Sequence, residues 1–289
     1  MTTKVVCSLS EVPLHHIEKS PLSSTLVYLT GIMSRAVKEK THDAVLLFGL
    51  PGVGKTMLAV SLARWISDKI SEWEALYVNG DMAALIPDVS DPKAQELVKP
   101  SLGEMNLLEK SSKQGFILVI DGMESLFSRQ KGVLLAKVIT RVKDILSDEN
   151  TRAIVVGTTR DPSQIPEALL SAFGKRWYVP PTGMDRLPDW LAFAGMDKAV
   201  VKPISEVAYY WAKDLGVRFI APEDVLRAAG QVKGTNPTGE AILSSAPSLF
   251  ISADTKQQYE KENHYFITQA QLLSKGFNSG RLRLLPNPL

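Results

Sequence analysis

The chain has 289 residues, which is enough for one large domain or two smaller ones. Apolar residues make up 45% of it and charged residues 22%, a composition that excludes disordered and fibrous proteins. The formal net charge of +2 excludes a strong overall attraction to nucleic acid or to anionic membranes.

The chain contains a single cysteine, Cys7. One cysteine excludes an intrachain disulfide and a zinc cage built from cysteines, and it fits a reducing compartment. The N-terminus lacks the basic-then-apolar pattern of a signal peptide, and no run of 18 apolar residues occurs. We therefore expect a cytoplasmic protein with no membrane partner.

The predicted elements begin after an N-terminal segment, residues 1–20, that shows no clear period. A helical pattern follows at 21–40, and apolar runs then alternate with helical patterns. The runs lie at 43–48, 75–79, 116–120, 153–157 and 176–179, and the clearest helical patterns at 57–66, 134–146 and 165–173. This alternation predicts an α/β fold with a doubly wound parallel sheet of five strands. Its ligand belongs at the carboxyl ends of the strands.

A glycine-rich loop joins the first run to its helix. Residues 49–56 read Gly-Leu-Pro-Gly-Val-Gly-Lys-Thr, the phosphate-binding loop of a P-loop NTPase, between a strand and a helix as that loop requires. Glycines let main-chain amides approach a phosphate at the positive end of the helix. We therefore expect ATP to contact the loop and the residue after it: Gly49, Pro51, Gly52, Val53, Gly54, Lys55, Thr56 and Met57.

The same pattern predicts a Mg²⁺ site. Lys55 supplies an ammonium for the β and γ phosphates, and Thr56 offers a hydroxyl to the metal. Asp121 directly follows the most apolar run, so its carboxylate lies at the strand end where it can hold Mg²⁺. We expect Thr56 and Asp121 to be the metal ligands.

The group that activates water is left open by the sequence. Gly122 follows Asp121 and carries no side chain. Glu124, two positions further on, and Asp81, after the second run, are both candidates for the base, and a site without a competent base is the third possibility. Thr158, Thr159 and Arg160 follow the fourth run and could sense the γ-phosphate, and we take Thr159 as a catalytic candidate.

The pattern changes after residue 182. Helical stretches at 185–194, 205–215, 222–232 and 238–246 predict a small helical lid domain, residues 183–246. Strand-like runs at 248–252, 264–268 and 281–285 predict a β-rich, hairpin-containing tail, residues 247–289. The P-loop α/β domain then occupies residues 21–182.

These motifs resemble those of AAA+ ATPases of the classical AAA type, over roughly residues 22–246. Residues 49–56 match the Walker A motif, 116–124 resemble Walker B, 154–162 the sensor 1 strand, and 165–180 the segment that carries arginine fingers. Residues 238–242 resemble the turn beside the adenine, which implies that Gly239 contacts the nucleotide. The resemblance implies ATP, ADP and Mg²⁺ as ligands and a homo-oligomeric ring, usually a hexamer. It also implies an ATPase motor that remodels a macromolecule.

The chain departs from the family pattern at several positions. Gly122 stands at the catalytic glutamate and Arg160 at the sensor 1 asparagine. Residues 170–172 hold no arginine at the finger positions, so Lys175 and Arg176 are the nearest basic residues. The pore-loop segment 84–88 has no aromatic residue. These departures leave nucleotide binding intact and predict weaker hydrolysis.

Two alternatives stay open. RecA-like hexameric motors, which move nucleic acid, place their base after the second strand, where Asp81 stands, and end in β-hairpins. In that reading the finger from a neighbouring subunit would be Lys275, Arg281 or Arg283. The other alternative is an ATP-bound switch or scaffold with little hydrolysis, which the glycine at position 122 favours.

Overall fold

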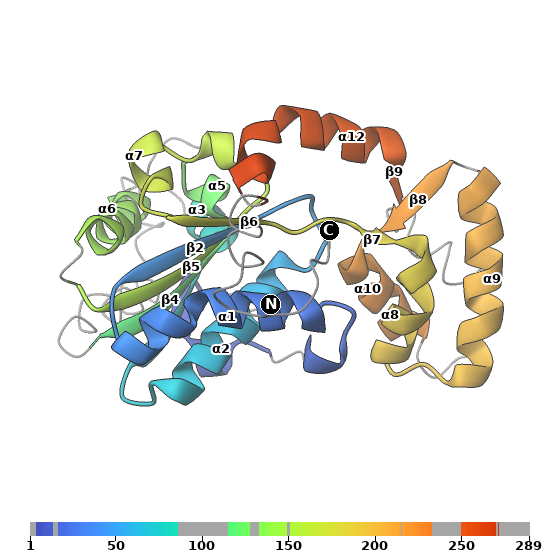
Figure 1. The fold of residues 1–289 in the computed structure, drawn as a ribbon, viewed down its shortest axis with the longest axis horizontal. Coiled ribbons are helices and arrows are strands. Elements are labelled where there is room, and N and C mark those ends of the chain that lie inside the picture. The colour runs from blue at the N-terminus through green and yellow to red at the C-terminus, as the bar shows by residue number, and fades with distance from the viewer. Residues whose placement is uncertain are drawn as a thin grey trace, which may run out of the picture.

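The computed structural model describes residues 4–13, 17–85, 115–127, 133–148, 151–214, 216–232, 250–269 and 271. They form an α/β unit with helices on both faces of one sheet, next to a smaller region of helices and short strands (Figure 1). Within these residues no helix combines the length and the apolar character that crossing a bilayer requires.

The main sheet has six strands in the order β1-β3-β4-β5-β2-β6. They are β1 (Val6–Ser8), β2 (Asp43–Phe48), β3 (Glu74–Asn79), β4 (Phe116–Asp121), β5 (Ala153–Thr159) and β6 (Lys175–Tyr178). The last five are the predicted strands and pair in parallel, which confirms the doubly wound P-loop fold. Their carboxyl ends meet beside the glycine loop.

The sixth strand, β1, was not predicted. It pairs antiparallel with β3 at the edge of the sheet, with Val6 opposite Val78 and Cys7 opposite Tyr77. A strand of three residues is too short for a periodic signal, and its pairing is with residues far along the chain. Burial of Val6 and Cys7 fixes it there and covers the outer edge of β3.

Alternate residues of the strands face two separate halves of the core. Val45 and Leu47 of β2 pack with α1 (Ser23–Glu39) and α2 (Lys55–Lys69) on one face. Leu46 packs on the other face. That face is covered by α3 (Gly80–Leu85), α5 (Met123–Phe127), α6 (Val133–Ser147) and α7 (Glu167–Leu170). The period of two in each strand therefore supplies both faces with apolar side chains.

The smaller region contains three described helices and a three-stranded sheet of order β7-β8-β9. The helices are α8 (Leu187–Phe193), α9 (Lys198–Asp214) and α10 (Pro222–Val232), and the strands are β7 (Thr182–Gly183), β8 (Val217–Ile220) and β9 (Phe250–Ser252). The helices overlap the stretches predicted at 185–194, 205–215 and 222–232. Strands β7 and β8 add β structure that the helical pattern did not predict, whereas β9 lies within the strand predicted at 248–252.

Helix α9 begins earlier than the predicted 205–215 and contains Pro203. A proline inside a helix removes one hydrogen bond and normally ends the helix. Here Val201, Ile204, Ala208 and Ala212 are buried at helical spacing on both sides of it. Packing of this stripe therefore outweighs the local cost of the proline.

The predicted strand at 264–268 is wrong, because residues 264–269 are helical. They follow α12 (Ala253–Glu262), which the Ser252 side chain caps by accepting from the Thr255 amide at 3.0 Å. Ile267 packs against Phe48 and Tyr178, so a tertiary contact overrides the β-like pattern. In Figure 1 α12 lies over the carboxyl-end side of the main sheet. The predicted helix 238–246 and strand 281–285 lie outside the described residues.

Candidate active site

The glycine loop links β2 to α2 as predicted. Gly54 caps the helix with φ 97°, a left-handed conformation that favours glycine, and a Cβ there would lie 2.5 Å from Leu22 Cδ1. The cap position has no side-chain hydrogen bond, so the loop leads directly into the first turn of α2. Free amides at a helix N-terminus form an anion-binding site.

Lys55 is buried within this loop. Its Nζ donates hydrogen bonds to the carbonyl oxygens of Gly49, at 2.9 Å, and Leu50, at 2.8 Å. Burial lowers the pKa of Lys55 to about 8, and the negative charges of Glu124 and Asp121 oppose that shift. The ammonium therefore lies inside the loop, with two carboxylates close enough to act on its charge.

Asp121, at the end of β4, accepts hydrogen bonds from hydroxyls on three other elements. Thr56 Oγ1 donates at 2.8 Å to Oδ1 and 3.0 Å to Oδ2, and Tyr77 OH donates at 2.7 Å to Oδ2. Thr158 Oγ1 donates at 2.6 Å to Oδ1. The predicted pair of Thr56 and Asp121 is thus in direct contact.

Tyr77 and Thr158 belong to this cluster, although the sequence did not single out Tyr77. Burial, and then the charge of Asp121, raises the pKa of Tyr77, so it stays a hydroxyl donor. The signal available was its place near the end of β3, next to β4, where Val119 is its register partner. The apolar pattern of residues 75–79 alone does not show which face of the sheet the Tyr77 side chain occupies.

The donor set at this point fits Mg²⁺. A threonine hydroxyl and a carboxylate are the hard oxygen ligands that magnesium prefers, with waters and phosphates completing the octahedron. Among the described residues there is no cluster of three or more His, Cys, Asp or Glu that could hold a metal alone. Thr56 and Asp121 are therefore suited to a metal that arrives with a phosphate ligand.

Glu124, near the start of α5, is a buried carboxylate with a 5% exposed side chain. Its Oε1 accepts a hydrogen bond from Arg160 Nε at 2.6 Å, and this bond raises the pKa of Arg160. Its Oε2 is buried, and no described residue donates to it. One oxygen of the carboxylate is therefore fixed and the other is available as an acceptor.

Asp81, the other candidate base, is exposed at the start of α3 and accepts a hydrogen bond from the Ser125 hydroxyl. It lies beside Gly122, whose φ is 69°, and a Cβ on Gly122 would stand 3.3 Å from Asp81 Oδ1. A glutamate at position 122 would therefore be strained and crowded. Both acidic candidates lie near the end of β4, but Glu124 is buried and Asp81 is exposed.

Thr159 faces away from Asp121. Its side chain is fully buried and its Oγ1 accepts the amide hydrogen of Asp161 at 3.2 Å. Successive strand residues point to opposite faces, so Thr158 is the residue of β5 whose side chain contacts Asp121. A catalytic role for Thr159 stays a prediction.

The basic residues considered for a neighbouring subunit have partners within the chain. Lys175 pairs with Asp43 at the start of β2. Arg176 Nη2 donates to the Leu170 carbonyl at 2.8 Å, and the guanidinium lies 5.9 Å from the centre of the Phe266 ring. The other predicted residues lie outside the described part of the chain: Gly239, Lys275 and Arg281.

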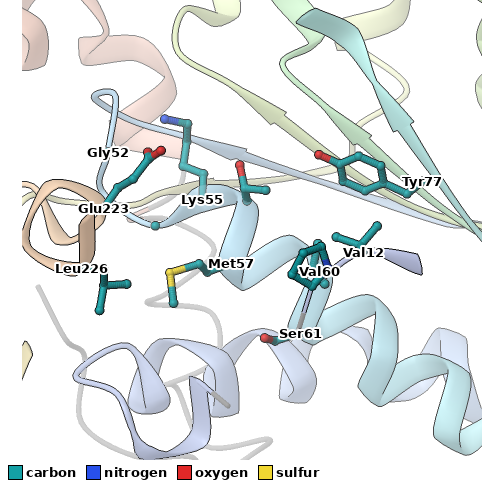
Figure 2. Close-up of a pocket in the computed structure, with 12 residues that line it drawn as sticks. Val12, Gly52, Lys55, Met57, Val60, Ser61, Tyr77, Glu223 and Leu226 are labelled. Atoms are coloured by element: carbon teal, nitrogen blue, oxygen red, sulfur yellow. The ribbon is translucent and has the colours of Figure 1, made fainter. Parts of the chain in front are cut away.

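A cavity of about 230 Å³ opens beside the glycine loop. The N-terminal segment contributes Val12 and Pro13, α10 contributes Glu223 and Leu226, and the other lining residues are Gly52, Gly54, Lys55, Thr56, Met57, Val60, Ser61 and Tyr77. Figure 2 shows the tips of Lys55 and Glu223 extending in the same direction, away from Met57 and Leu226. The cavity thus has a charged end at the loop and an apolar end beyond it.

The Glu223 amide donates to the Gly52 carbonyl at 3.1 Å, which joins α10 to the loop. Of the cavity residues outside the loop motif, the sequence predicted only Met57. Val12 and Leu226 come from segments far apart in the chain, so their presence here depends on the tertiary fold.

Comparison with known proteins finds a family model that matches the part of the chain holding this site. Residues 45–181 match the AAA family, described as the ATPase family associated with various cellular activities. The match begins in β2 and ends just before β7, so it contains the glycine loop, Asp121, Glu124 and Arg160. It favours the AAA assignment over the RecA-like alternative.

Curated relatives agree over the same part of the chain. Fidgetin-like protein 1 of Drosophila melanogaster is 31% identical over 144 residues, which cover 47% of this chain and 25% of that protein. Cell division protein C of Sulfolobus acidocaldarius is 27% identical over 151 residues, covering 50% and 37%. Spastin of Danio rerio is 32% identical over 151 residues, covering 50% and 24%. The matched region is thus well under half of each relative.

Solved structures share the fold over nearly the whole chain. The FIGL-1 AAA domain in complex with ADP superposes with a TM-score of 0.59 at 16% identity, covering 91% of this chain and 93% of that one. A katanin structure, reported for its self-assembly, has a TM-score of 0.55 at 15% identity, covering 89% and 93%. Together, the family match over residues 45–181, just under half of the chain, and these likenesses show that the chain is similar to AAA ATPases over that part and shares their fold.

Proposed function

We propose that this chain is the ATP-binding and ATP-hydrolysing subunit of an oligomeric ATPase that remodels a macromolecule. The observation that carries the proposal is the contact of Thr56 with Asp121, 2.8 Å apart, beside a glycine loop and a cavity of about 230 Å³. A buried lysine, a hydroxyl and a strand-end carboxylate at one loop are the groups that a nucleoside triphosphate with its metal needs.

In this proposal the loop amides and Lys55 bind the phosphates. Lys55 Nζ would exchange its bonds to the loop carbonyls for bonds to the β and γ phosphates. The nucleoside would occupy the cavity, with its base against the apolar side chains of Met57, Val60 and Leu226. The FIGL-1 AAA domain, which shares the fold, was solved in complex with ADP, and this supports nucleotide binding.

Thr56 and Asp121 would hold Mg²⁺, whose chemistry is to neutralise phosphate charge. The hydroxyls of Tyr77 and Thr158 also donate to the Asp121 carboxylate and hold it in place. These two residues therefore act on the carboxylate and leave Thr56 free to turn its hydroxyl oxygen toward the metal.

For hydrolysis, we propose Glu124 as the general base. The oxygen of a water molecule attacks the γ-phosphorus, the bond to the β–γ bridging oxygen breaks, and ADP leaves with its electron pair. The water proton passes to Glu124 Oε2, the oxygen that has no described donor. Asp81 is the second candidate because it lies beside Gly122, but its exposure leaves it less shielded from solvent.

Assembly is part of the proposal. Solved katanin, a protein with the same fold, is described in terms of self-assembly, and the curated spastin relatives share the AAA region. We propose a homo-oligomeric ring, a hexamer as the family resemblance implies, acting in the cytoplasm on a protein or a nucleic acid. A basic residue of a neighbouring subunit, among Lys175, Arg176, Lys275 and Arg281, would complete each site.

Nucleotide binding and phosphate release test the proposal. Lys55→Ala should abolish the thermal stabilisation that ATP and Mg²⁺ give the wild-type protein, because the loop loses its phosphate ligand. Lys38→Ala, at an exposed lysine of α1, should keep it. ATP binding that survives Lys55→Ala unchanged would refute the site, and tight binding without any phosphate release would leave a switch instead of a hydrolase.

A further inference from the structure

We propose that Arg160 and Tyr259 are positioning residues for Glu124, and that α12 thereby connects the smaller region to the catalytic carboxylate. The inference rests on the proposed function, in which Glu124 accepts the proton of the attacking water. It assigns a task to the arginine that stands at a position where the family resemblance implies asparagine.

Arg160 holds one oxygen of Glu124 and leaves the other free. Its Nε lies 2.6 Å from Glu124 Oε1, and the side chains are 55% and 5% exposed, respectively. A short charge-assisted hydrogen bond restrains the position of the carboxylate oxygen that accepts it. A base that is oriented by a third group is the arrangement found in activated catalytic pairs.

The free oxygen is the unusual part of this pair. Oε2 is buried, and within the described residues no donor reaches it. Buried polar atoms nearly always have a partner, and exceptions in native proteins call for an explanation such as a catalytic role. Arg160 also follows β5 two residues after Thr158, whose hydroxyl lies 2.6 Å from Asp121 Oδ1, so the Glu124–Arg160 pair lies at the strand ends that carry the proposed metal site. Oε2 is therefore an acceptor suited to a water at the γ-phosphate.

Tyr259 of α12 fixes the backbone of Arg160. Its hydroxyl donates to the Arg160 carbonyl at 2.9 Å across 99 residues of sequence. Its ring stacks on Tyr178 of β6, with centroids 6.0 Å apart and planes at 19°. The tyrosine is thus anchored on the sheet while it holds the loop that carries the arginine.

The other end of α12 contacts the small sheet. The helix follows β9 directly, and Lys256 Nζ lies 5.0 Å from the centre of the Phe219 ring in β8. Figure 1 shows α12 running from the small sheet across the side of the main sheet. A displacement of the small sheet would therefore reach Arg160 through one helix.

Steady-state kinetics on the full chain test this inference. Arg160→Met should lower kcat about 100-fold, the scale of a lost general base, while KM and the Kd for ATP change less than about twofold. Arg160→Lys should recover part of kcat. Tyr259→Phe should lower kcat by a factor of about 2 to 10, as expected for one hydrogen bond. Tyr265→Phe, on the exposed ring nearby, should change nothing.

A double-mutant cycle separates positioning from simple stability. Glu124→Gln should reduce kcat strongly, and adding Arg160→Met to Glu124→Gln should then reduce it no further, because Arg160 acts only through the carboxylate. Effects that multiply would overturn the inference, as would a Tyr259→Phe variant that matches Tyr265→Phe. Unchanged turnover in Glu124→Gln would instead show that Glu124 is not the general base. That result would contradict the proposed function and not only this inference.

Discussion

Gly122 illustrates how a single residue shapes the candidate site. At φ 69° it adopts a conformation that costs other residues about 1–2 kcal/mol, and Asp81 Oδ1 stands within 3.3 Å of where its Cβ would be. A glutamate is therefore poorly accommodated where the family resemblance implies one. Carboxylates are instead supplied at two neighbouring places, by the exposed Asp81 and the buried Glu124.

Lys55 makes the stability of the fold depend on pH. Burial lowers its pKa from 10.5 to about 8, so between these values the unfolded chain binds more protons than the folded one. Stability from this residue therefore rises with pH through that window and is flat below it. The free energy of unfolding of the wild type, relative to Lys55→Met, should increase by about 2 kcal/mol between pH 8 and pH 10.

Urea unfolding of both proteins at several pH values measures this difference. Lys38→Met, which removes an exposed lysine of α1, is the matched control and should show no such rise. A constant difference between wild type and Lys55→Met across the window would mean that Lys55 titrates as it does in water.

At the scale of elements, local signals were sufficient for the core of the fold. The strand, glycine loop and helix at 43–69 were predictable because an apolar run, a glycine pattern and a helical stripe lie next to one another. The contact of Thr56 with Asp121 was predictable because Asp121 directly follows an apolar strand, and the ends of parallel strands lie beside the glycine loop. By contrast β1, β8 and the helix at 264–269 depend on partners distant in sequence, which no local period reports.

The same distinction applies to the site. The cavity is lined by Tyr77, Val12 and Leu226, which come from segments far apart in the chain. Their meeting depends on the tertiary fold, so no sequence motif predicted them. Arg160 was noted for its position, but its bond to Glu124 depends on the start of α5 and the residue after β5 meeting at neighbouring strand ends. The sequence therefore indicated the glycine-loop end of the pocket, where we propose that phosphate binds, and left the apolar end and the Glu124–Arg160 pair undetermined.

Helix α10 is the element whose contribution to binding is easiest to test. Leu226 presents an apolar side chain to the cavity, so Leu226→Glu should weaken ATP binding at least about tenfold by placing a charge against the base. Val207→Glu introduces the same charge at an exposed position of α9 and should leave the Kd unchanged. Titration with a fluorescent ATP analogue gives both constants, and equal affinities would exclude α10 from the nucleoside pocket.

At the scale of the whole molecule, the proposed ring predicts a mass that depends on nucleotide. In the family resemblance each site is completed by a neighbour, so ATP that is bound but not hydrolysed should favour assembly. Glu124→Gln with ATP and Mg²⁺ should therefore give a discrete oligomer by light scattering, larger than the species without nucleotide.

Thr56→Ala is the control for that measurement, because it removes the hydroxyl that contacts Asp121 and that we propose as a ligand of Mg²⁺. It should remain in the smaller form under the same conditions. A Glu124→Gln protein that stays monomeric at high concentration with saturating ATP would contradict the assembly part of the proposal.

The placement of the N-terminal segment has a further consequence. Residues 6–8 close the outer margin of the sheet through β1, and a few residues later Val12 and Pro13 form one wall of the cavity. A ligand that packs against Val12 and Pro13 should therefore also stabilise β1 at the edge of the sheet. Ligand occupancy and the pairing of β1 with β3 should therefore be linked thermodynamically through residues 6–13.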